Sequence, residues 1–122
     1  MTTASCKAKG RVLQQTFRDC LRNAGHNHGL FFDDIKSTGM GQSGVDIQLS
    51  PAARKVFGNL TVECKNMEAL NVVKVFWDHA VKYPESCPLL VHKRNKTMPL
   101  VTLRLSDFMV MFERSLIEKN HT

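Results

Sequence analysis

Two residues of opposite charge stand two positions apart in the stretch LTVECKN, residues 60–66. Side chains of a β-strand alternate between its faces, so Glu63 and Lys65 would share one face. Val62 and Cys64 would take the other face. An acid and a base placed in this way form either an ordinary surface ion pair or part of a reactive site. The pair alone does not decide between these interpretations.

A second acid stands in the preceding apolar stretch, VDIQL at residues 45–49. Alternation places Asp46 and Gln48 on the face opposite the core. If the two strands are neighbours, Asp46, Glu63 and Lys65 meet at one edge of a sheet. Carboxylates are oxygen ligands suited to Mg²⁺ or Mn²⁺, and such an ion can bind a phosphate and activate a water molecule. Lys65 would add a positive charge, or a base if its pKa were lowered.

The chain has 122 residues and a formal net charge of +6. A positive charge favours an anionic partner such as nucleic acid, because clustered cations gain affinity by displacing counterions from phosphates. The length fits one domain, so we expect a single domain over residues 1–122 with frayed ends at 1–6 and 119–122.

Other features indicate the compartment. No apolar run at the N-terminus resembles a signal peptide, and the four cysteines lack a Cys-x-x-Cys spacing. The apolar segments are shorter than the roughly 20 residues that span a bilayer. We therefore expect a cytoplasmic protein with reduced thiols that is neither secreted nor bound to a membrane.

Apolar spacing and turn residues predict the elements that would position these side chains. Helical periodicity ends at Gly25 and again before Pro84, and Ser50–Pro51 is typical of a helix start. The expected helices are 7–23, 51–57, 70–81 and 106–117, and the expected strands are 31–38, 45–49, 60–66, 89–92 and 100–105. This order predicts an α/β fold with a mixed central β-sheet flanked by helices, in which Phe76 and Trp77 belong to the core.

The pattern of an Asp, a strand and Glu-x-Lys resembles the PD-(D/E)XK nuclease superfamily, which has a restriction-endonuclease-like core of the order α-β-β-β-α-β. Three blocks are similar to a phage-encoded branch related to Holliday junction resolvases: KGRVLQ at 9–14, GVDIQLSPAARKVFGNLTVECKN at 44–66 and PLLVHKRN at 88–95. The resemblance covers the chain from Lys9 to about Phe108. It implies a metal-dependent DNA endonuclease that hydrolyses phosphodiester bonds, with branched DNA as a candidate substrate, located in the host cytoplasm if phage-encoded.

The resemblance also implies roles for individual residues. Asp46 and Glu63 would hold Mg²⁺, with Mn²⁺ as a substitute. The backbone carbonyl of Cys64 would complete the protein ligands, so that its thiol belongs to the core and is no nucleophile. Lys65 would position or deprotonate the attacking water.

The sequence departs from the family pattern at several positions. Val45 stands where a proline is common before the acid. Many resolvases carry an acidic metal ligand where this chain has Gln14, whose neutral amide would make a second metal site weak. Gln14 and Gln48 are therefore expected as accessory residues. Related phage sequences tend to have a glutamine on the helix after the motif; the nearest residue here is Asp78, to which the pattern gives no role.

Basic residues flank the expected site on both sides. The residues that we expect to contact DNA are Lys9, Arg11, Arg18, Ser43, Lys93, Arg94 and Lys96. The alternative is that these charges form an ordinary solvated surface.

Two other functions share the same features. A basic DNA-binding module could keep the nuclease fold, cut poorly and act as an accessory of recombination or replication. A metal-dependent nuclease could also act on RNA, because nothing in the sequence distinguishes the sugar. By analogy with resolvases, we expect a homodimer, since symmetric cutting of a four-way junction needs two active sites. Its contact would use the helix of Trp77 or the apolar residues of the last helix, Phe108, Met109, Phe112 and Leu116.

Overall fold

The computed structural model describes residues 3–39 and 44–120. Ser43, expected at the DNA surface, lies outside these ranges. In chain order the elements are α1 (Thr3–His26), the 3-10 helix η1 (Phe32–Asp34), β1 (Ile35–Ser37), β2 (Ile47–Leu49), α2 (Pro51–Phe57), β3 (Leu60–Asn66), α3 (Val72–Lys82), β4 (Cys87–Lys93), β5 (Leu100–Thr102) and α4 (Leu105–Asn120).

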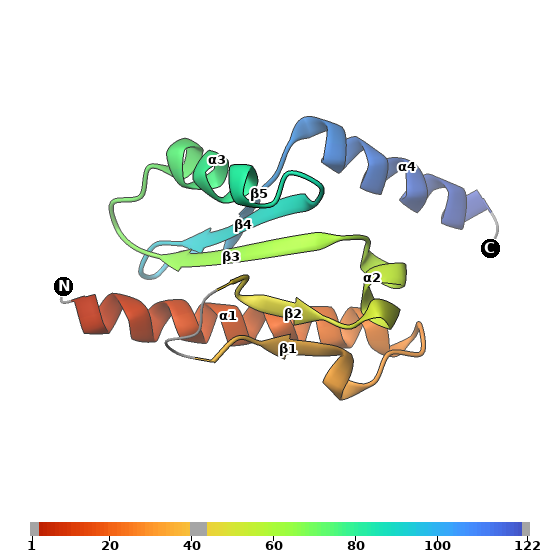
Figure 1. Ribbon diagram of the computed structural model, residues 1–122, viewed down its shortest axis with the longest axis horizontal. Coiled ribbons are helices and arrows are strands. Elements are labelled where there is room, and N and C mark those ends of the chain that lie inside the picture. Colours follow the sequence, from red (N-terminus) through yellow and green to blue (C-terminus); the bar gives the residue numbers. More distant parts are fainter. Residues whose placement is uncertain (1–2, 40–43, 121–122) are drawn as a thin grey trace.

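The described strands form a three-stranded mixed sheet and a separate hairpin (Figure 1). In the sheet, β3 pairs in parallel with β4, and β4 pairs in antiparallel fashion with β5. The hairpin of β1 and β2 lies beside β3, where the Asp46 N–H donates to the Val62 carbonyl at 2.9 Å. The expected mixed α/β class is confirmed, although hairpin and sheet are two units instead of one continuous central sheet.

Helices α1 and α3 lie on opposite sides of the three-stranded sheet (Figure 1). On the α1 side, Leu13 belongs to the main core together with Val62 and Cys64. On the α3 side, Phe76 packs with Leu90 in a smaller cluster. Because Val62 and Cys64 on one face of β3 are packed in the main core, the side chains of β3 have firmly defined directions.

Helix α2 has the limits that its sequence predicts. The Ser50 hydroxyl accepts a hydrogen bond from the Ala53 N–H at 3.1 Å, and Gly58 ends the helix with a φ of 87°. The seven-residue helix turns the chain from β2 into β3. It thereby brings the stretches VDIQL and LTVECKN side by side.

The long terminal helices extend further than the apolar periodicity predicts. Helix α1 spans Thr3–His26 instead of 7–23, and α4 continues to Asn120. Residues expected as frayed ends are thus helical wherever the structure describes them. A helix continues through polar residues without an apolar stripe, so periodicity marks only its packed part. Within the described residues, no helix combines the length and the apolar character that crossing a bilayer requires.

The strand expected at 31–38 is much shorter in the structure. Only residues 35–37 pair with β2. Phe31 and Phe32 are 80% and 70% exposed. The Cζ atom of Arg22 lies 3.4 Å from the centre of the Phe32 ring, so this aromatic residue stacks under a guanidinium at the surface.

The prediction that Trp77 lies in the core is wrong. Its side chain is 52% exposed, whereas Phe76 is 4% exposed. Helix α3 has two apolar stripes, and the stripe that contains Phe76 faces the sheet. Val73, Trp77 and Val81 recur at intervals of four residues on the outer side and are all exposed. Both stripes have helical spacing, so periodicity could not distinguish them.

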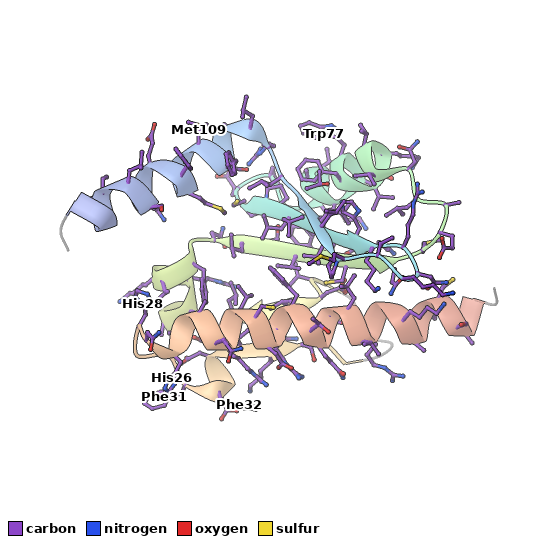
Figure 2. The ribbon with its side chains drawn as sticks, turned by 180° about the vertical axis from the view of Figure 1, so that it is seen from behind. His26, His28, Phe31, Phe32, Trp77 and Met109 are labelled. Atoms are coloured by element: carbon purple, nitrogen blue, oxygen red, sulfur yellow. The ribbon has the colours of Figure 1, made fainter. Side chains whose placement is uncertain are left out.

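Helix α4 projects away from the sheet toward the C-terminus (Figure 1). Between Leu105 and Ile117 no residue is buried. Trp77 and Met109 both lie on the side of the molecule away from α1 (Figure 2). The exposed large apolar residues of α4 are Leu105, Phe108, Met109, Val110, Met111, Phe112, Leu116 and Ile117. The chain therefore presents an apolar surface that its own fold does not cover.

Candidate active site

The backbone of β3 determines which groups face the hairpin. The Met67 N–H just after the strand donates to the Lys93 carbonyl of β4 at 3.2 Å, so backbone groups at odd-numbered positions face β4. Those at even-numbered positions face the opposite edge, where the Cys64 N–H donates to Asp46 Oδ2 at 2.7 Å. Because the N–H and C=O of one strand residue point to the same side, the Cys64 carbonyl also faces the edge on which Asp46 lies.

Asp46 is held at its backbone and at its carboxylate. Gln14 Nε2 donates to the Asp46 carbonyl, and also to the Thr38 carbonyl at 3.2 Å. Gln14 is 8% exposed, so its amide is a buried bridge between α1 and the hairpin. Burial raises the pKa of Asp46, the Cys64 N–H opposes this, and the charge of Glu63 raises the pKa further. A bound cation would favour the ionised form of such a carboxylate.

Glu63 and Lys65 share one face of β3, as alternation predicts. Lys65 Nζ lies 3.4 Å from Glu63 Oε1, and the two side chains are 41% and 25% exposed. Val62 and Cys64 point to the opposite face and are buried in the core. The carboxylate of Glu63 thus lies at the surface with the ammonium group of Lys65 on one side.

His79 of α3 lies on the other side of Glu63, and the sequence analysis missed it. Its Nδ1 atom is 4.0 Å from Glu63 Oε2, and its Nε2 atom is 2.9 Å from the Thr61 carbonyl oxygen. The side chain is only 4% exposed. The sequence contained a weak signal: position 79 lies on the same helical face as Phe76 and Ala80, where a polar residue needs a partner.

Two open clefts meet at Glu63 and Lys65. The first, of about 560 Å³, lies on the α1 side, and the second, of about 390 Å³, lies against α3. Functionally relevant residues lining the first cleft are Arg11, Gln14, Asp46, Glu63, Cys64 and Lys65. Those lining the second are Glu63, Lys65, Asp78, His79, Lys82 and Tyr83. The structure therefore brings together the predicted acid, acid and base, with Gln14 beside them.

Gln48 and Asp78 have other surroundings. Gln48 is exposed, donates to the Thr38 hydroxyl at 3.4 Å and lines a different cleft from the one that contains Asp46. Asp78 lies at the second cleft, and its carboxylate is 2.6 Å from Lys74 Nζ. Gln14 is thus the accessory residue that touches Asp46, whereas Gln48 stands apart from the first cleft.

The basic residues fall into two groups. Lys9 Nζ donates to Asn95 Oδ1 at 2.8 Å, so α1 and the loop after β4 are in contact. At the end of β4, Lys93 Nζ donates to the Thr97 carbonyl of that loop at 2.9 Å, and Arg94 and Lys96 in the loop are exposed.

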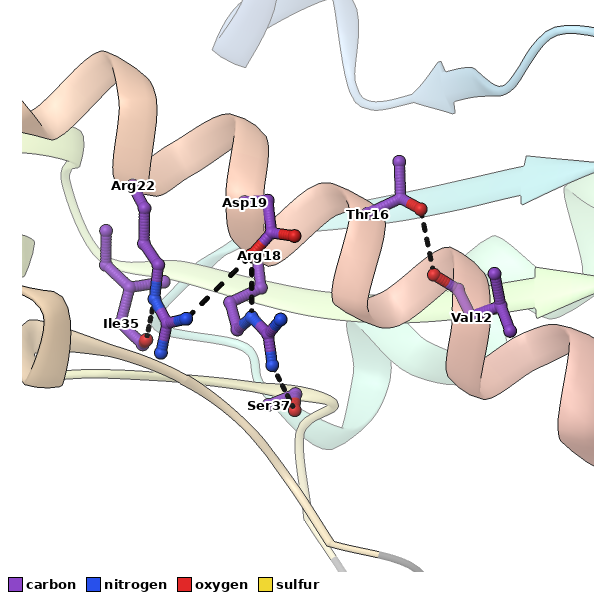
Figure 3. A network of polar contacts seen from close by, with 7 residues as sticks. All are labelled: Val12, Thr16, Arg18, Asp19, Arg22, Ile35 and Ser37. Carbon is purple, nitrogen blue, oxygen red and sulfur yellow. Dashed lines mark hydrogen bonds and ion pairs between the residues drawn. The ribbon is translucent and has the colours of Figure 1, made fainter.

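Arg18 belongs to a different network (Figure 3). Its guanidinium contacts Asp19 Oδ1 at 3.0 Å and the Ser37 hydroxyl at 3.5 Å. Arg22 beside it donates to the Ile35 carbonyl at 3.0 Å. These contacts join α1 to β1, so Arg18 acts within the fold.

The oxygen atoms at this edge form a small set of possible metal ligands. Among the residues that the structure describes, no three His, Cys, Asp or Glu side chains gather around one point. A cation here would depend on Asp46, Glu63 and the Cys64 carbonyl, with water completing the shell. The Cys64 thiol does not compete as a metal ligand, because it lies in the core and burial raises its pKa, which disfavours the thiolate that binds metals.

Comparisons with known proteins add no assignment. A scan against models of protein families, a search of curated proteins and a search of solved structures each found no match.

Proposed function

We propose that this protein is a metal-dependent endonuclease that hydrolyses phosphodiester bonds in DNA. One observation carries the proposal: Asp46 is fixed to the Cys64 N–H at 2.7 Å and lines the same cleft as the Glu63–Lys65 pair. An acid directly before one strand and Glu-x-Lys on the next strand along the chain are the residues that the PD-(D/E)XK resemblance requires. The restriction-endonuclease-like core is part of this proposal.

Each residue has a definite task in the proposed reaction. Asp46, Glu63 and the Cys64 carbonyl would hold Mg²⁺, for which Mn²⁺ would substitute, because all three offer hard oxygen ligands. When bound, the ion supplies positive charge to the phosphate and lowers the pKa of a water molecule. Lys65 would orient that water or remove its proton. Gln14 would fix the position of Asp46 through the Asp46 carbonyl.

The DNA backbone would lie along the α1 side of the first cleft. Arg11 lines this cleft, and the contact between Lys9 and Asn95 places the basic loop after β4 beside α1. Such contacts bind phosphates regardless of sequence. The proposed contacts are Lys9, Arg11, Lys93, Arg94 and Lys96.

The preferred substrate would be branched DNA, and the active form a homodimer. Both proposals follow from the resemblance to resolvases, and the uncovered apolar residues of α4 support the dimer. Two copies would present two sites to opposed strands of a junction.

A panel of labelled DNA substrates tests the proposed function. Four-way junctions, flaps, duplexes and single strands are incubated with Mg²⁺, with Mn²⁺ or with EDTA. We expect nicking that requires the metal and is fastest on the branched substrates. DNA binding without turnover in every condition would instead establish the alternative, a nuclease-fold module that serves recombination or replication. RNA strands of the same sequences are assayed beside the DNA panel, and cleavage of the RNA in place of the DNA would identify the other alternative.

A further inference from the structure

Lys82 is a cation in an open cleft and has no task in the proposed reaction. It belongs to the last turn of α3, is exposed, and lines the cleft of about 390 Å³ against this helix. Among the residues that the structure describes, no ion pair or side-chain hydrogen bond involves Lys82. Its ammonium group is therefore available to a ligand in the cleft.

The carboxylates of this cleft already face other cations. Glu63 Oε1 lies 3.4 Å from Lys65 Nζ, and Asp78 Oδ2 lies 2.6 Å from Lys74 Nζ. Each of these pairs combines one negative and one positive charge, so Lys82 adds a positive charge that no carboxylate balances. The lining of the cleft therefore favours an anion.

The cleft against α3 adjoins the first cleft at the proposed catalytic pair. Glu63 and Lys65 line both clefts. A DNA strand whose scissile phosphate lies at this pair must continue in two directions, because the phosphate joins a nucleotide on each side. The first cleft, with Arg11 in its lining, accommodates one direction. The cleft against α3 is open to the other direction.

We propose that the cleft against α3 binds the backbone phosphate that follows the one at the Glu63–Lys65 pair, with Lys82 as its cation. A lysine ammonium binds a phosphate as a point charge on a flexible stem, so it needs no rigid geometry. Tyr83 also lines this cleft, and a phenol hydroxyl can donate to a phosphate oxygen. This inference rests on the proposed function, which places DNA at the same pair.

Contacts on both sides of the Glu63–Lys65 pair would hold the strand in register across the site. Lys82 is then a positioning residue, because it binds a phosphate beside the reacting one. Such a contact is insensitive to the base sequence. Its loss should weaken DNA binding and raise KM, with a much smaller effect on kcat.

A scan with uncharged methylphosphonate linkages tests this proposal. Each phosphate of one labelled strand is replaced in turn within a four-way junction, whose branch point fixes the register, and binding is measured in EDTA so that nothing is cut. For the wild type, we expect one replacement next to the cleavage position to weaken binding by about three- to tenfold. Lys82→Gln should weaken binding of the unmodified junction by a similar factor, and that replacement should then cause no further loss.

Two further variants separate the Lys82 contact from a general effect of charge. Lys74→Gln removes the same charge from the same helix, but its lysine is paired with Asp78, so its scan should match that of the wild type. Lys82→Arg keeps the charge and should restore the sensitive position.

The outcomes distinguish this inference from the proposed function. A scan of Lys82→Gln that equals the wild-type scan would overturn the phosphate contact, while metal-dependent nicking would leave the roles of Asp46 and Glu63 standing. Wild-type protein that binds the junction and cuts no substrate would overturn the proposed cleavage, and the scan in EDTA would still decide whether Lys82 holds a phosphate. Protein that does not bind the junction would overturn both.

Discussion

The negative charge of Asp46 lowers the stability of the folded protein, and the hydrogen bond from the Cys64 N–H offsets this effect only partly. Burial and the charge of Glu63 raise its pKa, so the folded protein holds this proton more tightly than the unfolded chain does. The ionised carboxylate therefore lowers stability as the pH rises from its ordinary pKa of 3.8 through the raised value in the folded protein. Such a cost is common for residues that serve function.

Replacing Asp46 should therefore stabilise the metal-free protein. We expect Asp46→Asn to raise the Tm at neutral pH by on the order of a few degrees, because the amide removes the charge and still accepts from the Cys64 N–H. The difference should shrink as the pH falls toward the ordinary pKa of the carboxyl group. Thermal denaturation in EDTA across this pH range is the measurement, with the exposed Asp78→Asn as control. A lower Tm for Asp46→Asn at neutral pH would contradict this assignment.

At the residue scale, the sequence predicted the local geometry of β3 but not its surroundings. The alternation of Glu63 and Lys65 follows from strand geometry alone, and the structure confirms that they share a face. His79 could not be found in this way, because its position beside Glu63 depends on how α3 packs against β3. Its hydrogen-bond partner, Thr61, lies 18 positions away in the chain.

At the element scale, α3 shows the limit of periodicity. This helix has two apolar stripes. The stripe that is buried is the one that contacts apolar residues of β4 such as Leu90. The apolar period therefore predicted the helix correctly and placed Trp77 wrongly. The short helix α2 was predictable because its start and end are set by Ser50 and Gly58 themselves.

Neighbouring aromatic residues on α3 should differ strongly in their effect on stability. Phe76→Ala should lower the free energy of unfolding by about 3 kcal/mol or more, since it empties a buried position. Trp77→Ala should cost less than about 1 kcal/mol, because half of its surface is already exposed. Urea denaturation of both variants measures the difference. Equal losses would show that Trp77 is packed after all.

The proposed DNA surface on α1 and the loop after β4 leads to a prediction about salt. Arg11→Ala and Arg94→Ala should each weaken DNA binding and reduce the slope of log affinity against log salt by roughly one unit. Arg18→Ala is the matched control, because its guanidinium bonds to Asp19 and Ser37, and its slope should stay unchanged. Fluorescence anisotropy over a range of salt concentrations provides the slopes. If only Arg18→Ala changes the slope, the DNA lies along another face of α1.

At the scale of the whole molecule, the most unusual feature is the uncovered helix α4. The apolar residues of α4 would suit a helix in the core as well as a helix at an interface between molecules. The sequence therefore could not show that no other part of the described chain packs over them. The rings of Phe108 and Phe112 stack with centroids 6.0 Å apart, although both side chains are about half exposed. A large contiguous apolar surface of this kind is typical of an interface between molecules.

A second copy of the chain is the partner that we expect for α4. Sedimentation at micromolar concentration should show a dimer, and Phe112→Asp should convert it to a monomer by placing a charge in the contact. Val12→Asp, which alters an exposed apolar residue of α1, should leave the dimer intact. A wild-type protein that stays monomeric with and without junction DNA would refute the dimer.

The central claim is that Asp46 and Glu63 hold a metal ion that cuts DNA, and a nicking assay on Glu63→Gln tests it most directly. The substitution preserves the shape of the side chain and removes its charge, while Glu85→Gln makes the same change at an exposed acid outside both clefts. We expect metal-dependent nicking of a labelled junction by the wild type and by Glu85→Gln, with a fall of at least about 100-fold in Glu63→Gln and none left in EDTA. Nicking by Glu63→Gln at the wild-type rate, or nicking that persists in EDTA, would contradict the account.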